Sequence, residues 1–241
     1  SMAGWMPVLG RAGYCAAKSA LGQFFEVLRA EVARDGITLL LVYPSFLDTP
    51  IDRNALGADG KPAGSGPVVL LDHSDNCASG GTMDTMTVLG AMLDAGLTDA
   101  AAFAIFDPAA VQQMIAAGVG STITLSLGGK LDMPSIGLTG QPRTVTGRIR
   151  LVCDGRYRNR GPMGRGELND MGPTAVLQVA GIDVVVISNH VEPNDLAAFT
   201  AVGIAPDRLT YVMLKSRIHW RAGLRHLSHA TVECAGTGVC S

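Results

Sequence analysis

The sequence has no apolar run of the roughly 18 residues that a membrane-spanning helix requires. Its 30 glycines and 12 prolines interrupt every apolar stretch, although 47% of its residues are hydrophobic. Residues 1–6 show no basic stretch followed by an apolar one, so we expect no signal peptide. A net charge of −2, with both signs interspersed, gives no field suited to nucleic acid or an anionic membrane. These absences favour a globular protein without nucleic-acid or membrane partners.

The cysteines lack the spacing of a metal knuckle or a disulfide framework. There are five, an odd number, and the closest two are separated by five residues. No CxxC pair exists, which excludes a zinc ribbon. The pattern favours free thiols in a reducing compartment, and we therefore expect a cytoplasmic protein. The cysteines are Cys15, Cys77, Cys153, Cys234 and Cys240.

The first 57 residues contain too few elements for a complete domain. Apolar residues recur at helical spacing over Tyr14–Val32, and Gly36 follows as a stop signal. Ile37–Tyr43 is a continuous apolar run, typical of a buried parallel strand. One helix and one strand cannot close a sheet or cover its edges. Residues 58–66 (ADGKPAGSG) then have the composition of a linker or a fusion junction.

Residues 67–241 alternate strand and helix signals and predict one mixed-sheet α/β domain of ordinary size. Asp107 followed by Pro108 indicates a helix start, and Ala180–Gly181 indicates a tight hairpin. The stretch Arg156–Arg165 has the composition of a solvated loop. The predicted strands are Val68–Asp72, Ala101–Phe106, Thr122–Leu127, Thr144–Val152, Ala175–Val179, Ile182–Ile187, Arg208–Leu214 and Thr231–Cys234, and the predicted helices are Thr82–Leu93, 108–117, Pro193–Val202 and Trp220–Ser228.

Tyr14 and Lys18 lie four residues apart, so both project from one face of the first predicted helix. A nearby ammonium favours phenolate, which would make the tyrosine a competent general acid or base. Ser1, thirteen residues earlier, could donate a hydrogen bond to a substrate carbonyl. The spacing alone is a weak signal.

The context of this pair resembles the short-chain dehydrogenase/reductase family, whose fold is Rossmann-like and doubly wound. The similarity covers residues 1 to about 60 and includes Gly13–Lys18 and Tyr43–Pro50. It implies that Ser1 polarises a carbonyl, Tyr14 transfers a proton, Lys18 holds the nicotinamide ribose of NAD(P), and Thr49 contacts the carboxamide. The family's glycine-rich pyrophosphate loop precedes this region and has no counterpart here. We therefore do not expect oxidoreductase activity from this segment, and its Rossmann-like part is a fragment.

A polar loop, Asp72–Asp84, follows the first strand of the second segment. Three interpretations are open for its side chains. Gly80 and Gly81 could bring backbone N–H groups to an anionic ligand, the aspartates and histidine could bind a metal, or Asp72 and Asp75 could cap backbone amides within the loop. The loop's candidate site residues are Asp72, Asp75, Asn76, Gly80, Gly81 and Asp84.

Two further polar clusters each follow a strongly apolar strand. Residues 188–195 follow one strand and residues 215–221 follow the next. Polar residues at the ends of consecutive strands share one rim of a sheet, where α/β proteins bind ligands. The candidates there are Asn189, His190, Lys215, His219 and Arg221.

These clusters, together with other motifs in order, resemble the C-terminal domain of MlrC-type (microcystinase C family) metallopeptidases. The resemblance implies a zinc-dependent hydrolase that cleaves amide bonds of small peptides. It also implies that most zinc ligands belong to a larger N-terminal domain, which a partner would have to supply, so that the candidate loops face that domain and the substrate. A non-catalytic interaction domain is the alternative. The motifs are 71–76, 80–84, 106–108, 127–130, 172–177, 187–190 and 214–221.

Overall fold

The computed structural model describes residues 12–37, 39 and 66–240, and the chain separates into two units, 1–63 and 64–241. In the first unit, the helix α1 (Ala12–Val32) continues into the 3₁₀ turn η2 (Ala33–Asp35). Gly36 ends it with a φ of +74°, a conformation that suits glycine. The predicted first helix is thus confirmed, whereas most of the predicted strand Ile37–Tyr43 lies outside the described residues.

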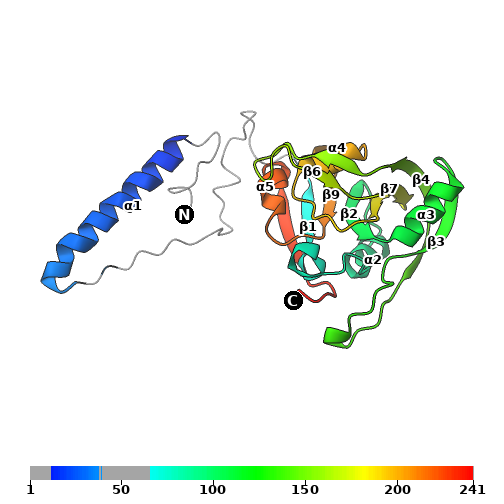
Figure 1. The fold of residues 1–241 in the computed structure, drawn as a ribbon, viewed down its shortest axis with the longest axis horizontal. Coiled ribbons are helices and arrows are strands. Elements are labelled where there is room, and N and C mark those ends of the chain that lie inside the picture. The colour runs from blue at the N-terminus through cyan, green and yellow to red at the C-terminus, as the bar shows by residue number, and fades with distance from the viewer. Residues whose placement is uncertain (1–11, 38, 40–65, 241) are drawn as a thin grey trace. The chain divides into compact units, whose positions relative to one another are not determined.

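The second unit is built on an eight-stranded sheet with the order β10-β1-β9-β2-β8-β7-β4-β3. The first five strands in this order pair in parallel, and β7, β4 and β3 add an antiparallel half. Figure 1 shows β1, β9 and β2 side by side. The mixed α/β fold is therefore confirmed. The strands are β1 (Val68–Asp72), β2 (Ala100–Phe106), β3 (Thr122–Leu127), β4 (Arg143–Cys153), β7 (Thr174–Val179), β8 (Ile182–Ile187), β9 (Tyr211–Leu214) and β10 (Ala230–Cys234).

Helices cover both faces of this sheet. One core combines α2 (Thr87–Asp94) and α3 (Pro108–Ala117) with every second residue of the central strands, and the other combines α4 (Leu196–Ala201) and α5 (Trp220–Leu224) with the alternate residues. Burial of apolar side chains on both faces explains why the central strands are continuously apolar rather than alternating. Short 3₁₀ turns complete the unit: η4 (His73–Asp75), η5 (Cys77–Ser79), η6 (Pro134–Ile136), η7 (Pro206–Arg208) and η8 (Arg225–Leu227).

Several local predictions are confirmed in detail. Asp107 caps α3, because its carboxylate accepts a hydrogen bond from the backbone N–H of Ala110 at 3.0 Å, and Pro108 occupies the first turn. The β7–β8 hairpin turns at Ala180 and Gly181, with φ angles of +48° and +86°. Two positive φ values in a two-residue loop match the twist of the flanking strands.

Other boundaries were wrong. The helix predicted from Thr82 begins at Thr87, because the preceding backbone is held by side chains of the polar loop. The helix predicted from Pro193 begins at Leu196, since Asp195 accepts a hydrogen bond from Ala197 N at 2.7 Å and caps it. The strand predicted from Arg208 begins at Tyr211, after the turn η7. The helix predicted over Trp220–Ser228 divides into α5 and η8.

The predicted solvated loop Arg156–Arg165 is also partly wrong. It contains β5 (Arg156–Arg158), which pairs with β6 (Leu168–Asp170) in a separate two-stranded sheet. Tyr157 packs into the core on the α4 and α5 side. The flanking arginines are exposed, and their charge obscured a single inward-facing aromatic residue.

The isoleucines offer a matched test of the core. Ile149 of β4 is fully buried, whereas Ile136 of η6 is 42% exposed. We expect Ile149→Ala to lower the free energy of unfolding by about 2–5 kcal/mol, because it leaves a cavity in the core. Ile136→Ala should change it by about 0.5 kcal/mol or less. Urea denaturation followed by circular dichroism measures both, and equal effects would contradict the assigned burial.

Candidate functional site

The candidate residues gather where the parallel strands end. Strands β1 and β9 are neighbours in the sheet. From β1 the chain passes through α2 to β2, which lies beyond β9, and from β9 it passes through α5 to β10, which lies beyond β1. The two neighbouring strands therefore send their connections to opposite faces of the sheet. This divergence creates the switch point at which open α/β sheets bind ligands. The polar loops after β1 and β9 meet there.

A buried ion cluster fills the base of this switch point. The Lys215 ammonium donates hydrogen bonds to Asp72 Oδ2 at 2.7 Å and Asp75 Oδ2 at 2.8 Å. It also donates to the carbonyl oxygen of Thr85 at 2.9 Å. Lys215, Asp72 and Asp75 are fully buried. The cluster therefore ties the loop after β1 to the end of β9 and presents no face to solvent.

The cluster shifts the pKa values of its members. Burial raises the pKa of Asp72 and outweighs the opposing effect of Lys215. Burial also acts to raise the pKa of Asp75, but Lys215 and hydrogen bonds from Thr85 prevail and lower it. Burial acts to lower the pKa of Lys215, but the two carboxylates raise it. Lys215 and Thr85 thus favour the ionised form of Asp75, whereas burial opposes that of Asp72, whose Oδ1 has no hydrogen-bond partner among the described residues.

Asp75 also shapes the loop itself. Its Oδ1 accepts a hydrogen bond from Met83 N at 2.8 Å, and its Oδ2 accepts one from Thr85 N at 2.9 Å. Asn76 Oδ1 accepts from Ala78 N at 3.0 Å. These contacts match the interpretation of the loop as internally capped for Asp75. The same interpretation was wrong for Asp72, whose Oδ2 accepts from the Lys215 ammonium and whose Oδ1 has no partner among the described residues.

Asp84 and the glycines complete this bracing. Asp84 Oδ2 accepts hydrogen bonds from Lys130 N at 2.7 Å and Leu131 N at 2.8 Å, which fixes the segment after β3. Gly80 has a φ of +93°, and a Cβ at Gly81 would lie 2.5 Å from the backbone carbon of Asp75. Gly80 thus provides a left-handed backbone conformation and Gly81 a close backbone approach, which accounts for both glycines without a ligand.

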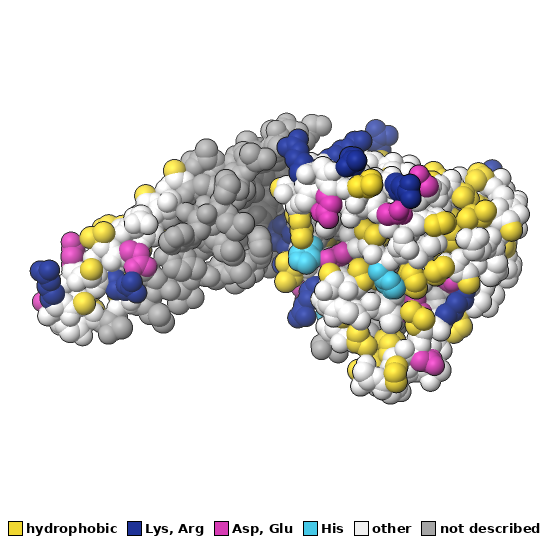
Figure 2. Space-filling view, viewed as in Figure 1, with side chains coloured by type: hydrophobic (Ala, Val, Ile, Leu, Met, Phe, Trp, Pro, Cys, Tyr) yellow, Lys and Arg dark blue, Asp and Glu magenta, His cyan; other side chains and the backbone are white. Residues whose placement is uncertain are grey.

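His190 and Asn189 lie on the exposed side of the rim. The His190 ring stacks on Phe106 with 3.9 Å between ring centroids, and its Nε2 lies 2.9 Å from the carbonyl oxygen of Thr82. Because a carbonyl only accepts hydrogen bonds, Nε2 carries the proton. Asn189 donates to the carbonyl oxygen of Asp170 at 3.2 Å. Figure 2 shows histidine side chains at the surface of this unit, among acidic and hydrophobic neighbours.

His219 forms a second arrangement with two residues that were not among the sequence candidates. Its Nδ1 lies 2.6 Å from Glu192 Oε2, and Ser216 Oγ donates to Glu192 Oε1 at 2.6 Å. The His219 side chain is 46% exposed and that of Glu192 is 8% exposed. Burial, and secondarily the charge of Glu192, raise the pKa of the Cys77 thiol to about 11. Arg221, the remaining candidate, is half-buried on α5.

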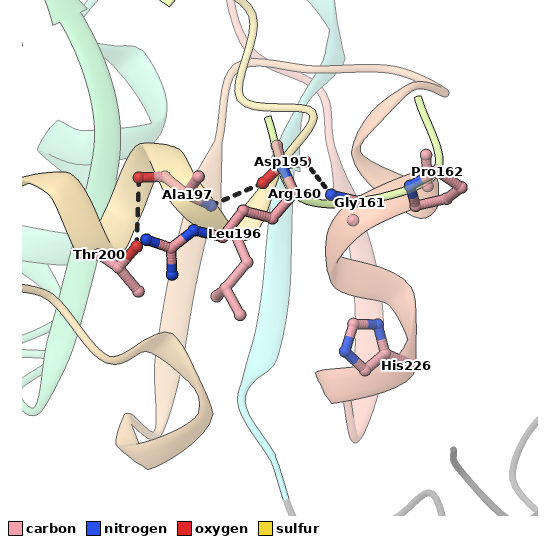
Figure 3. Close-up of a pocket in the computed structure, with 10 residues that line it drawn as sticks. Arg160, Gly161, Pro162, Asp195, Leu196, Ala197, Thr200 and His226 are labelled. Atoms are coloured by element: carbon pink, nitrogen blue, oxygen red, sulfur yellow. Dashed lines mark hydrogen bonds between the residues drawn. The ribbon is translucent and has the colours of Figure 1, made fainter. Parts of the chain in front are cut away.

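A separate cavity of about 210 Å³ lies between α4, α5 and the loop after β5. Asp195 forms part of its wall by accepting hydrogen bonds from Arg160 N at 3.0 Å and Gly161 N at 2.6 Å. Figure 3 shows the Arg160 side chain extending toward Thr200, with His226 on the opposite side. None of the sequence candidates lines this cavity.

The described structure does not test the oxidoreductase candidates. Ser1 and Thr49 lie outside the described residues, and only the backbone of Tyr14 and Lys18 is described, within α1. Whether they form a site stays a prediction.

The described residues do not supply a metal site. Among residues 12–37, 39 and 66–240, no three His, Cys, Asp or Glu side chains form a group that could hold an ion. The carboxylates of the rim are already engaged, Asp72 and Asp75 by Lys215 and Asp84 by backbone N–H groups.

The strands and loops that form this rim lie within a region that matches a known protein family. The model of the family described as MlrC C-terminus matches residues 70–241, most of the chain. The chain belongs to the MlrC C-terminus family. Microcystinase C from Sphingomonas sp. is 31% identical over 177 residues, which are 73% of this chain and 33% of that protein. The chain thus spans about a third of the length of this relative.

A solved structure supports the fold. A provisionally assigned metallopeptidase from Mesorhizobium sp. BNC1 superposes with a TM-score of 0.63 at 23% identity, and the match covers 73% of this chain and 34% of that one. At this identity the likeness concerns the fold alone. It agrees with the mixed sheet described above.

The first segment matches a different family. The short chain dehydrogenase model matches residues 1–59. A dehydrogenase/reductase SDR family protein 7-like from Anopheles gambiae is 38% identical over 64 residues, 27% of this chain and 20% of that protein. Both resemblances found in the sequence are thereby confirmed. Among the described residues, no helix is both long and apolar enough to cross a membrane.

The ion cluster predicts a large effect of its lysine on stability. Lys215→Met should lower the free energy of unfolding by about 3–5 kcal/mol, because two buried carboxylates lose their counter-ion. Arg156→Met is the control, since both side chains of its ion pair with Asp170 are exposed, at 62% and 41%. Its expected loss is small, because water screens an exposed ion pair. Urea denaturation at pH 7 compares the two, and a similar small loss for both would contradict a buried cluster.

The two aspartates should respond differently to neutralisation and to pH. At neutral pH Asp75→Asn should cost about 3 kcal/mol, and Asp72→Asn should cost less, because burial opposes the charge of Asp72 whereas Lys215 and Thr85 favour the charge of Asp75. The folded pKa of Asp75 lies below its ordinary value of 3.8. Its ionised form therefore stabilises the fold above pH 3.8, and this contribution disappears as the pH falls through the lowered folded pKa.

The sign is reversed for Asp72, whose raised folded pKa means that protonation, as the pH falls toward 3.8, favours the folded state. Urea midpoints of the wild type and both variants, measured from pH 7 downward, check these signs. The deficit of Asp75→Asn should shrink toward acid pH. A deficit that grows with acidity would show that the two carboxylates have been assigned the wrong way round.

Proposed function

We propose that residues 67–241 act as the C-terminal domain of a metal-dependent hydrolase of the microcystinase C type, which cleaves amide bonds in small peptides. The observation that carries this proposal is the match over residues 70–241. Four of the quoted motifs, 71–76, 106–108, 187–190 and 214–221, lie at the ends of the neighbouring parallel strands β1, β2, β8 and β9. Ligands of α/β proteins bind at such strand ends. Residues 58–66 would join this domain to the first segment.

The buried and the exposed residues of the rim have different proposed roles. The buried members, Lys215 with Asp72 and Asp75, hold the loops in place and make no contact with solvent. Asn189, His190 and His219 are exposed above them. We assign these exposed side chains to the substrate or to the interface with the metal-bearing domain.

We propose zinc as the metal and place its ligands outside the described residues. The relative Microcystinase C is about three times as long as the matched region, which leaves room for such a domain. When bound, the ion would supply Lewis-acid polarisation of an amide carbonyl. A partner or a further segment carrying the ligands would face the rim, and we expect this assembly in the cytoplasm.

The first segment carries a second candidate function, NAD(P)-dependent oxidoreduction, favoured by the family match over residues 1–59. The match includes Tyr14 and Lys18 but no glycine-rich phosphate loop. We propose that this segment binds dinucleotide only weakly. A change in NADPH fluorescence that saturates at micromolar NADPH would contradict weak binding and favour the oxidoreductase function.

The hydrolase proposal predicts an activity that depends on a second domain. The purified chain alone should bind no stoichiometric zinc and hydrolyse no linear peptide amide. Addition of zinc and of the separately produced N-terminal part of Microcystinase C should give turnover. Chromatography of the cleaved peptide measures this turnover. The N-terminal part without this chain is the control. Turnover and stoichiometric zinc in the chain alone would show that its own residues form the metal site, and no turnover in the mixture would count against the hydrolase.

A further inference from the structure

Glu192 is placed to fix the position of a proton on His219. The two side chains come from different loops, since Glu192 follows β8 and His219 follows β9. Glu192 Oε2 and His219 Nδ1 are 2.6 Å apart. An ionised carboxylate can only accept hydrogen bonds, so the Nδ1 atom must be the donor. In the neutral ring the lone pair is then left on Nε2.

The carboxylate is itself held in place. Ser216 donates to Glu192 Oε1 at 2.6 Å, and the backbone N–H of Trp220 lies 3.4 Å from the Ser216 hydroxyl oxygen. Ser216 is fully buried and the Glu192 side chain is 8% exposed, so these groups have little freedom to exchange partners with water. One oxygen of Glu192 is thus used by Ser216 and the other by His219.

The opposite side of the His219 ring is accessible. The His219 side chain is 46% exposed, and no described residue bonds its Nε2. His190, exposed on the same rim, has the reverse arrangement, because its Nε2 donates to the carbonyl oxygen of Thr82. The rim therefore carries two exposed histidines with their protons on different nitrogens.

We propose that His219 Nε2 is the proton-transfer atom of this rim and that Glu192 is its positioning residue. This inference rests on the proposed function, amide hydrolysis. In that reaction a water oxygen bonds to the carbonyl carbon, the carbon–nitrogen bond breaks, and one proton moves from the attacking water to the leaving amine nitrogen. His219 Nε2 takes up that proton and passes it on, while the Glu192 carboxylate stabilises the imidazolium formed between the two events.

The inference can be tested on the chain alone, without metal or substrate. Two-bond ¹⁵N–¹H correlations of ¹⁵N-histidine-labelled protein, at about pH 8 where histidine rings are generally neutral, report which ring nitrogen carries the proton. His219 should show the Nδ1–H tautomer and His190 the Nε2–H tautomer, with His219→Gln and His190→Gln assigning the signals. Glu192→Ala should convert His219 to Nε2–H, and Ser216→Ala, which keeps Glu192 Oε2, should not.

The outcomes separate this inference from the proposed function. Nε2–H on His219 of the wild type overturns the inference, even where Glu192→Ala fails to fold. In the two-domain assay, His219→Gln and Glu192→Ala should lower kcat at least about tenfold with little change in KM, while His226→Gln, at the separate cavity, should leave kcat unchanged. An unchanged kcat in His219→Gln also overturns it. Absence of turnover with the wild type would contradict the proposed amide hydrolysis but would not affect the tautomer assignment.

Discussion

The structure of the second unit depends on one ammonium group buried between two carboxylates. Lys215 contacts Asp72 and Asp75 although it lies 143 and 140 residues further along the chain. Removing three charges from water costs several kcal/mol for each ion, so such a cluster persists only when its hydrogen bonds are well made. Here the ammonium has several acceptors, and Asp75 receives backbone donors on both oxygens. The cluster fixes the loop after β1 against the end of β9 and so determines the shape of the rim.

This interior arrangement explains why the residues above it can be exposed and still ordered. His190 is held by Phe106 and Thr82, and His219 by Glu192. Each histidine thus has one ring nitrogen engaged by the protein. The rigid base and the two constrained rings form a surface suited to a substrate or a second domain. The membership in the MlrC C-terminus family and the length of Microcystinase C agree with such an arrangement.

Much of the fold could be predicted from local patterns. Apolar runs identified the central strands. The Asp107–Pro108 pair correctly predicted the start of α3, and Ala180–Gly181 correctly predicted the β7–β8 hairpin. The helix start at Thr82 could not be predicted, because the side chain that captures the backbone at Met83 and Thr85 belongs to Asp75, several residues earlier. The site was harder still. Its strand ends were predicted, but Glu192 and Ser216 were missed, since only the folded loops after β8 and β9 bring them together. The sequence did contain a signal for these two residues, because one polar cluster holds a glutamate and the next holds a serine and a histidine.

The pairing of β1 with both β9 and β10 has a consequence for how the chain acquires its structure during synthesis. The antiparallel strands β3, β4, β7 and β8 are close in sequence and can assemble while later residues are still being translated. Strand β1, made long before, must wait with its sides uncovered until β9 and β10 leave the ribosome. Throughout that interval Asp72 and Asp75 lack the cation that neutralises them, and they stay hydrated. The ion cluster therefore cannot form until Lys215 has been made, and a chain interrupted before Lys215 would contain most of the residues of the sheet but not this cluster.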